Sequence, residues 1–250
     1  RSTPKPSSAA SDVYKRQMYM NEFNEKLIVA LDSKEINQSK KLVSSLENKV
    51  SFFKIGLRTF VINGFNLVDE IKQKGKKVFL DLKLYDIKST IQETVARISE
   101  HKVDFLTVNG DPSVVEAAMI GRKDEKMKIL AVTFLTNQNR NDLDLSLIKD
   151  GNLNELVAER ASNAFIAGAD GIICSPLEAN LIRSKDHFSK KIIVTPGIRL
   201  NYSANEDQKR VSTPSEALKA GADYIVVGRP IWNAKDPILA VNDIFNDMIN

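Results

Sequence analysis

The chain has 250 residues, 42% of them hydrophobic and 27% charged, and it contains one cysteine and two histidines. These values are typical of a globular protein with a buried core, and they exclude a largely disordered chain, a disulfide scaffold and a metal site built from several thiolates. The net charge of +4 does not indicate a nucleic-acid-binding protein, because residues 1–17 contribute four basic side chains against one acidic one and leave the remainder nearly neutral.

Residues 1–22 differ in character from the rest of the chain. The segment begins rich in Ser, Ala and Pro, has no apolar core of a signal peptide and shows no helical periodicity. We expect it to be a non-native or disordered leader, and we expect residues 23–250 to form one domain. Because the apolar runs are strand-sized and the single cysteine fits a reducing compartment, we expect a cytoplasmic protein that does not span a membrane.

From Lys26 onward, short β-branched runs alternate with amphipathic segments. Strands are predicted at Lys26–Asp32, Ser51–Gly56, Lys76–Lys83, Val103–Asn109, Lys128–Thr136, Asp170–Ser175, Lys191–Ile198 and Asp223–Gly228. Helices are indicated between them by the sets Leu42/Val43/Leu46, Val61/Leu67/Val68/Ile71 and Ile91/Val95/Ile98, and then over Val114–Ile120, Leu153–Ala167, Leu177–Arg183, Pro214–Ala220 and Pro237–Ile249.

Eight strand–helix units of about 28 residues predict an α/β protein, a single closed (β/α)₈ TIM barrel with parallel strands. The loops that follow the strands build the active site in this architecture. Two long irregular stretches, Asn137–Asn152 and Leu200–Ser212, each follow a predicted strand, and we expect the second to be a lid.

The third predicted strand is the most informative segment. Its leucines share one parity, so Asp81 and Lys83 should point to the opposite side, into the barrel mouth. Further charges add to this pair: Asp86 just past the end of the same strand, Asp32 at the end of the first strand and Lys54 on the second. Because buried charges are costly unless they are paired, we expect an alternating network that can hold a lysine protonated as a general acid.

The last predicted strand leads into a candidate phosphate site. Gly228 allows close backbone approach, and Arg229 beside it supplies a guanidinium, a good partner for a phosphate dianion. Arg199 follows the seventh strand, and Gln208 lies in the loop beyond. Phosphate groups commonly bind at the loops after strands seven and eight of such barrels, so we expect these four residues to share one site.

Seven short segments, in their order and spacing, resemble the orotidine 5′-phosphate decarboxylase family over Lys26–Asn250. They are Val29–Asp32, Phe52–Gly56, Asp81–Ile87, Ala131–Thr136, Val194–Arg199, Asp207–Arg210 and Val227–Ile231. The resemblance implies a carbon–carbon lyase that converts orotidine 5′-monophosphate to UMP and CO₂ in pyrimidine biosynthesis. It also implies no cofactor and no metal, and no dinucleotide fingerprint, P-loop or metal-ligand cluster is visible in the sequence.

The resemblance further implies roles for the matching positions. Lys83 would donate the proton to the carbanion left by CO₂, and Asp81 would lie against the departing carboxylate. Lys54 and Asp86 would complete the charge network, with Asp86 reaching into the neighbouring site of a homodimer. The substrate would be bound by Asp32, Lys54 and Thr90 at the ribose, Thr136 at the pyrimidine, and Arg199, Gln208, Gly228 and Arg229 at the phosphate.

Two alternatives and two departures from the family pattern stand beside this interpretation. Related magnesium-dependent enzymes of sugar phosphates need an acidic metal ligand where this chain has Lys54. A non-catalytic nucleotide-binding barrel would have no need for the intact charges of the third strand. The chain has Asn109 where the family often has His, and Lys88 and Ser89 where it commonly has Pro.

Overall fold

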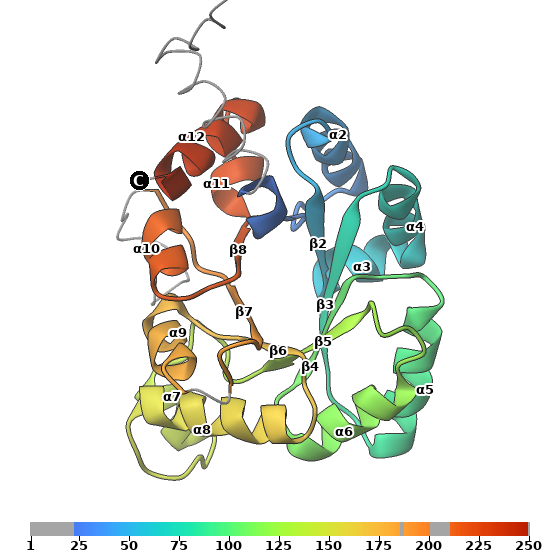
Figure 1. The fold of residues 1–250 in the computed structure, drawn as a ribbon. Helices are drawn as coiled ribbons and strands as arrows, with labels where there is room; N and C mark the ends of the chain where they lie inside the picture. The colour runs from blue at the N-terminus through green and yellow to red at the C-terminus, as the bar shows by residue number, and fades with distance from the viewer. Residues whose placement is uncertain (1–22, 186–187, 201–210, 250) are drawn as a thin grey trace, which may run out of the picture.

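The computed structural model describes residues 23–185, 188–200 and 211–249. The expected leader, residues 1–22, and Gln208 therefore lie outside the described residues, as does most of the expected lid. Figure 1 shows a ring of strands surrounded by helices. None of the helices in the described ranges is long and apolar enough to cross a membrane.

Eight parallel strands close into a barrel in sequence order, which confirms the predicted (β/α)₈ fold. The strands are β1 (Leu27–Ala30), β2 (Phe52–Gly56), β3 (Lys77–Leu84), β4 (Phe105–Asn109), β5 (Lys128–Val132), β6 (Gly171–Ile173), β7 (Ile192–Thr195) and β8 (Tyr224–Val227). Most end before the predicted boundary, and β5 ends four residues short of Thr136. The residues that follow each strand are thus free to line the barrel mouth.

The helices are α2 (Ile36–Leu46), α3 (Leu57–Asn63), α4 (Phe65–Gln73), α5 (Lys88–Ser99), α6 (Pro112–Gly121), α7 (Arg140–Leu145), α8 (Leu153–Ile166), α9 (Pro176–Arg183), α10 (Pro214–Lys219), α11 (Arg229–Trp232) and α12 (Pro237–Ile249). The one helix predicted from Val61 to Ile71 is in fact two, because Gly64 adopts φ 58° and ψ −140° between them. Val61 is consequently 76% exposed and is not a core residue. The short helices α7 and α11 were not predicted.

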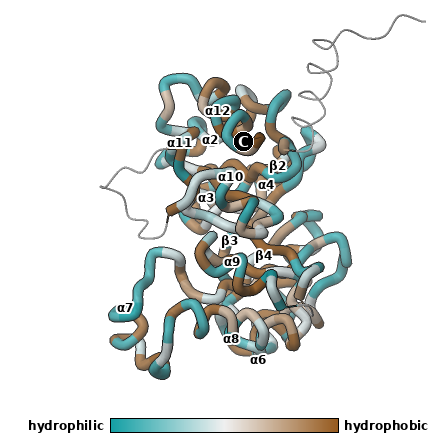
Figure 2. Tube along the Cα trace, turned by 60° about the vertical axis from the view of Figure 1, so that its left-hand side comes forward, coloured by the Kyte–Doolittle hydropathy of each residue, from teal (hydrophilic) through white to brown (hydrophobic). Residues whose placement is uncertain are grey.

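The barrel separates two apolar layers. Alternate strand residues fill the interior: Ile28, Ala30, Phe52, Phe79, Phe105, Leu130, Val132, Ile173, Val194 and Val226. The other parity packs against the helices, and Leu80 is fully buried there with Leu82 and Leu84 beside it. In Figure 2 the strand β4 is hydrophobic, whereas the segment around α7 extends from the body of the fold and is largely hydrophilic.

Three aspartates at equivalent positions stabilise the end of the barrel at which the strands begin. Asp104, Asp170 and Asp223 each precede a strand, and each carboxylate accepts a hydrogen bond from a backbone N–H of the strand before it at 2.7–2.8 Å. Each also pairs with a cation, Lys72, Arg122 or Arg183. The charges at this end are thus matched within the chain, as expected for the face that contributes to stability.

Aromatic packing inside the barrel generates the first prediction. The ring of Phe52 is 1% exposed and lies 4.9 Å from that of Phe105 and 5.9 Å from that of Tyr224. Phe52→Ala should lower the free energy of unfolding by about 3–5 kcal/mol, because it removes buried area and leaves a cavity. Urea unfolding measures this change. Ile166→Ala, at a side chain that is 80% exposed, is the control, and equal stability of the two variants would contradict the packing described.

Candidate active site

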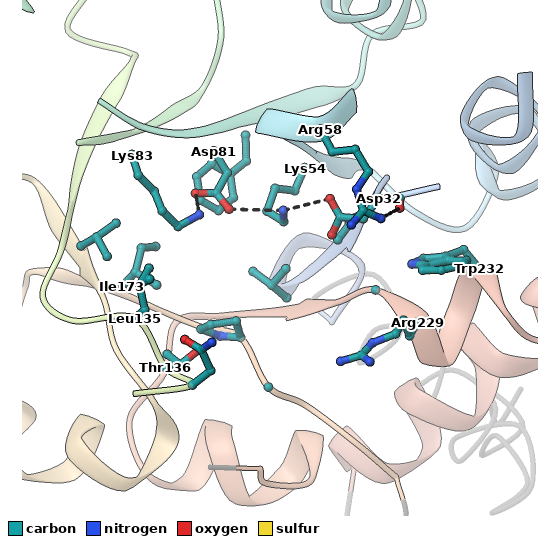
Figure 3. Close-up of a pocket in the computed structure, with 18 of the residues that line it drawn as sticks. Asp32, Lys54, Arg58, Asp81, Lys83, Leu135, Thr136, Ile173, Arg229 and Trp232 are labelled. Carbon is teal, nitrogen blue, oxygen red and sulfur yellow. Dashed lines mark hydrogen bonds and ion pairs between the residues drawn. The ribbon is translucent and has the colours of Figure 1, made fainter. Parts of the chain in front are cut away.

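A cavity of about 540 Å³ opens where the strands end. It receives side chains from most of the strand ends and from the loops that follow them. Its floor is the apolar interior of the barrel, represented by Ala30, Phe79, Val132, Ile173 and Val226. Polar and charged side chains lie above this floor, so the cavity combines an apolar base with a charged wall (Figure 3).

Four charges of alternating sign form a chain along one wall. Lys83 Nζ lies 2.7 Å from Asp81 Oδ1, Lys54 Nζ lies 3.2 Å from Asp81 Oδ2, and Lys54 Nζ lies 3.5 Å from Asp32 Oδ1. Figure 3 shows each of these contacts as a dashed line. The inward direction predicted for Asp81 and Lys83 is confirmed, since both line the cavity.

The position of Lys54 depends on a glycine. A Cβ atom on Gly56 would lie 2.8 Å from Asp32 Oδ1 and 3.2 Å from Lys54 Nζ. The absence of a side chain at the end of β2 thus lets the two charges meet. Lys54 itself is 8% exposed, and its hydrocarbon stem continues the interior row that begins with Phe52.

Burial and attraction oppose each other at these groups. Burial alone would raise the pKa of Asp81, but the neighbouring Lys54 and Lys83 ammonium groups and the hydrogen bonds from Lys83 and Thr107 lower it to about 2. Burial alone would lower the pKa of Lys54, but attraction to Asp81 and Asp32 prevails and raises it. Both groups are therefore charged at neutral pH.

Thr107 is a contributor that the sequence analysis missed. Its Oγ1 donates a hydrogen bond to Asp81 Oδ1 and accepts one from the backbone N–H of Lys83, both at 2.9 Å. Thr107 shares the inward parity of Phe105 on β4, and this pattern was the available signal. Lys83 has a left-handed φ of 52°, and the β3–β4 register shifts nearby, a local irregularity of the kind found beside active sites.

The expected phosphate residues lie together at another part of the wall. Arg199, Gly228 and Arg229 all line the cavity, as do Pro196 and Gly197. Next to them the backbone N–H of Arg199 donates to the carbonyl of Ser212 at 2.9 Å, so the two ends of the Leu200–Ser212 segment meet beside the site. Gln208 lies outside the described residues. Arg58 and Trp232 also line the cavity, and neither was predicted.

The remaining candidates divide into one inside the cavity and two outside it. Thr136 is 8% exposed and lines the cavity. Asp86 and Thr90 are exposed and are not among its lining residues. The Asp86 carboxylate instead accepts a hydrogen bond from the backbone N–H of Ile87 at 2.7 Å. In the structure the series of alternating charges therefore ends at Lys83 and does not include Asp86.

Within the described ranges, no group of three or more His, Cys, Asp or Glu side chains is arranged to hold a metal ion. The two carboxylates of the charge chain face the Lys54 ammonium from either side. The negative charge of both carboxylates is thus already balanced by the ammonium group of a protein side chain.

Comparison with known proteins gives concordant matches. The model of the orotidine 5′-phosphate decarboxylase / HUMPS family matches residues 25–244. An orotidine 5′-phosphate decarboxylase of Jannaschia sp. is 49% identical over 226 residues, which cover 90% of this chain and 99% of the relative. An orotidine 5′-phosphate decarboxylase of Ruegeria pomeroyi is also 49% identical over 226 residues, which cover 90% of this chain and 94% of the relative. The crystal structure of orotidine 5′-phosphate decarboxylase from Lactobacillus acidophilus has a TM-score of 0.77 and 32% identity, and covers 90% of this chain and 99% of its own.

The low pKa of Asp81 generates a pH prediction. Because the pKa in the folded state, about 2, lies below the unfolded value, ionisation of Asp81 stabilises the fold above about pH 4, by about 2–3 kcal/mol, and this contribution is lost as the pH falls toward 2. The difference in free energy of unfolding between the wild type and Asp81→Asn should therefore shrink over this range. Urea unfolding at fixed protein concentration measures it, with the exposed Asp150→Asn as control. A difference that is constant with pH would contradict the pairing.

Proposed function

The chain belongs to the orotidine 5′-phosphate decarboxylase / HUMPS family, and from this premise we propose that it converts orotidine 5′-monophosphate to UMP and CO₂. The observation that carries the proposal is the charge chain in the cavity, with Lys83 beside Asp81. Relatives named for this activity match 90% of the chain at 49% identity, which supports the same substrate here.

The proposed reaction breaks the bond between the pyrimidine ring and its carboxylate. CO₂ departs without the bonding electron pair, which stays on the ring carbon as a carbanion, and the Lys83 ammonium donates a proton to that carbon. Asp81 would lie against the departing carboxylate while holding Lys83 at 2.7 Å. A fixed charge arrangement that needs no rearrangement during the reaction is an effective way to stabilise a developing charge.

We propose that this chemistry requires no cofactor and no metal. The positive feature that supports this is Lys54, whose buried ammonium group lies between Asp32 and Asp81. A divalent cation on these carboxylates would have to share their space with that ammonium group, at a large electrostatic cost. The magnesium-dependent alternative is therefore disfavoured by the charge of the wall itself.

The substrate fits the cavity in one direction under this proposal. Thr136 would contact the pyrimidine, Asp32 and Lys54 the ribose hydroxyls, and Arg199, Gly228 and Arg229 the phosphate, with Gln208 expected from the lid. Binding of the phosphate group, which is remote from the reacting carbon, would supply binding energy that can hold the pyrimidine ring in place. A cytoplasmic location and the absence of nucleic-acid partners remain predictions.

We also propose a homodimer in which Asp86 serves the neighbouring site. Asp86 is exposed, and the side chains on either side of it, Tyr85 and Ile87, are 69% and 70% exposed. Exposed apolar surface of this kind marks protein interfaces. Thr90 is also exposed, in the first turn of α5 and four residues after Asp86, and under this proposal it would be presented to the partner with Asp86.

The function is tested by the ultraviolet absorbance of orotidine 5′-monophosphate with purified protein, with and without EDTA. Lys83→Ala should reduce turnover by about 10²–10⁴-fold, because it removes the general acid, while UMP binding stays nearly unchanged. Lys74→Ala, at a surface residue paired with Glu47, is the control. Absence of turnover by the folded wild type would overturn the proposal. A loss of turnover in EDTA would indicate a metal-dependent enzyme. Full turnover by Lys83→Ala would show that Lys83 is not the proton donor.

Complementation tests the shared site. Lys83→Ala and Asp86→Asn should each be nearly inactive as homodimers, but a mixed dimer contains one site with both native residues. Dissociating and reassociating an equal mixture should restore about one quarter of wild-type turnover, since about half of the dimers are mixed and each has one competent site. No recovery, with mixed dimers demonstrated by mass spectrometry, would place Asp86 in its own subunit's site.

A further inference from the structure

Two polar side chains at one end of the cavity, Arg58 and Trp232, have no role in the proposed function so far. Arg58 is the second residue of α3, and Trp232 is the last residue of α11. In Figure 3 both lie at the same end of the cavity as Arg229, next to Asp32, whereas Lys83, Leu135 and Thr136 lie at the opposite end. The cavity is thus longer than the charge chain, and its far end carries additional polar groups.

Trp232 presents a buried donor with no acceptor. Its Nε1 is shielded from solvent and has no hydrogen-bond partner among the described residues. Nε1 lies 3.6 Å from the point where a Cβ atom on Gly228 would be, and Asp32 Oδ2 lies 3.9 Å from the same point. The indole N–H thus lies close to Gly228 and to an Asp32 oxygen, and both Gly228 and Trp232 line the cavity. A buried unpaired donor costs free energy, which a bound acceptor atom would recover.

Arg58 presents a positive charge that the described residues do not neutralise. Its one hydrogen bond there is a long one, 3.5 Å from Nη1 to the backbone carbonyl of Asp32, and no carboxylate within the described ranges pairs with it. Lys54 and Lys83, by contrast, are both held by carboxylates. A guanidinium that lines a cavity without an anion is suited to bind an anionic group of a ligand.

We propose that Trp232 and Arg58 bind the phosphate group of the nucleotide, Trp232 as a neutral hydrogen-bond donor and Arg58 as a cation. The inference rests on the proposed function and adds two residues to those the family resemblance implies. The phosphate is the part of the substrate with both negative charge and several acceptor oxygens. It would also lie at the Arg229 end of the cavity, whereas the pyrimidine lies near Thr136.

The test compares UMP with uridine, which lacks the phosphate. Trp232 is the only tryptophan of the chain, so its fluorescence reports ligand binding at this end of the cavity in the wild type. Calorimetry with Trp232→Phe and Arg58→Gln should show the Kd of UMP raised about tenfold in each, with the Kd of uridine changed less than about twofold. The loss should diminish at high salt for Arg58→Gln and persist for Trp232→Phe, because screening acts on charge.

The control is Arg97→Gln, at a side chain that is 80% exposed and paired with Glu100 on the surface of α5. Thermal unfolding establishes that each variant is folded. Wild-type affinity for UMP in both variants would overturn the inference, and so would an equal loss for UMP and uridine, which would indicate contacts with the nucleoside. A wild type that binds UMP more tightly than uridine but does not decarboxylate the substrate would overturn the proposed function alone.

Discussion

The geometry of the site depends on one buried cation. Lys54 is 8% exposed and lies within 3.5 Å of carboxylate oxygens from Asp32 and Asp81, residues that follow or belong to different strands. A buried ammonium group is tolerated only with such partners, so it fixes the spacing of β1, β2 and β3 at their carboxyl ends. Gly56 makes this possible, since a side chain there would occupy the same space.

Lys83 lies inward, as the alternation of β3 requires, although its backbone is not that of a regular strand. Most of β3 follows strict alternation, with Phe79 and Asp81 inward and Leu80 outward. At Lys83 the backbone is left-handed and the β3–β4 register shifts, yet the side chain still lines the cavity, and Thr107 stabilises this conformation by hydrogen bonding both to the Lys83 backbone and to Asp81. Backbone strain of this kind persists only when the surrounding contacts compensate for it. Here the contacts are those that also orient the proposed proton donor.

The fold and the charge chain were predictable because both follow from local periodicity. Eight alternations of strand and helix determine the barrel, and parity alone directs Asp81 into the mouth. The break at Gly64, the helix α11 and the contact of Thr107 were not predictable, because they depend on a single backbone conformation or on register between strands. Asp86 illustrates the same limit, since its position three residues after Lys83 does not by itself reveal that its side chain lies outside the cavity of this chain.

The two ends of the cavity differ in how their charged and polar groups are paired. At the Lys83 end every charge is already matched by the chain, which keeps the reactive groups fixed whether or not a ligand is present. At the Arg229 end, no described carboxylate pairs with Arg58 and no described acceptor pairs with the indole N–H of Trp232, so a bound ligand could complete both interactions. Under the proposed function, the preorganised charges at the first end would lower the free-energy barrier of the reaction, and the groups left to bind the phosphate at the second end would supply binding energy that holds the reacting ring. Asp32 belongs to both ends, since its Oδ1 faces Lys54 while its Oδ2 lies 3.9 Å from the point where a Cβ atom on Gly228 would be, near Trp232 Nε1, so the charged wall and the ligand-binding end share one carboxylate.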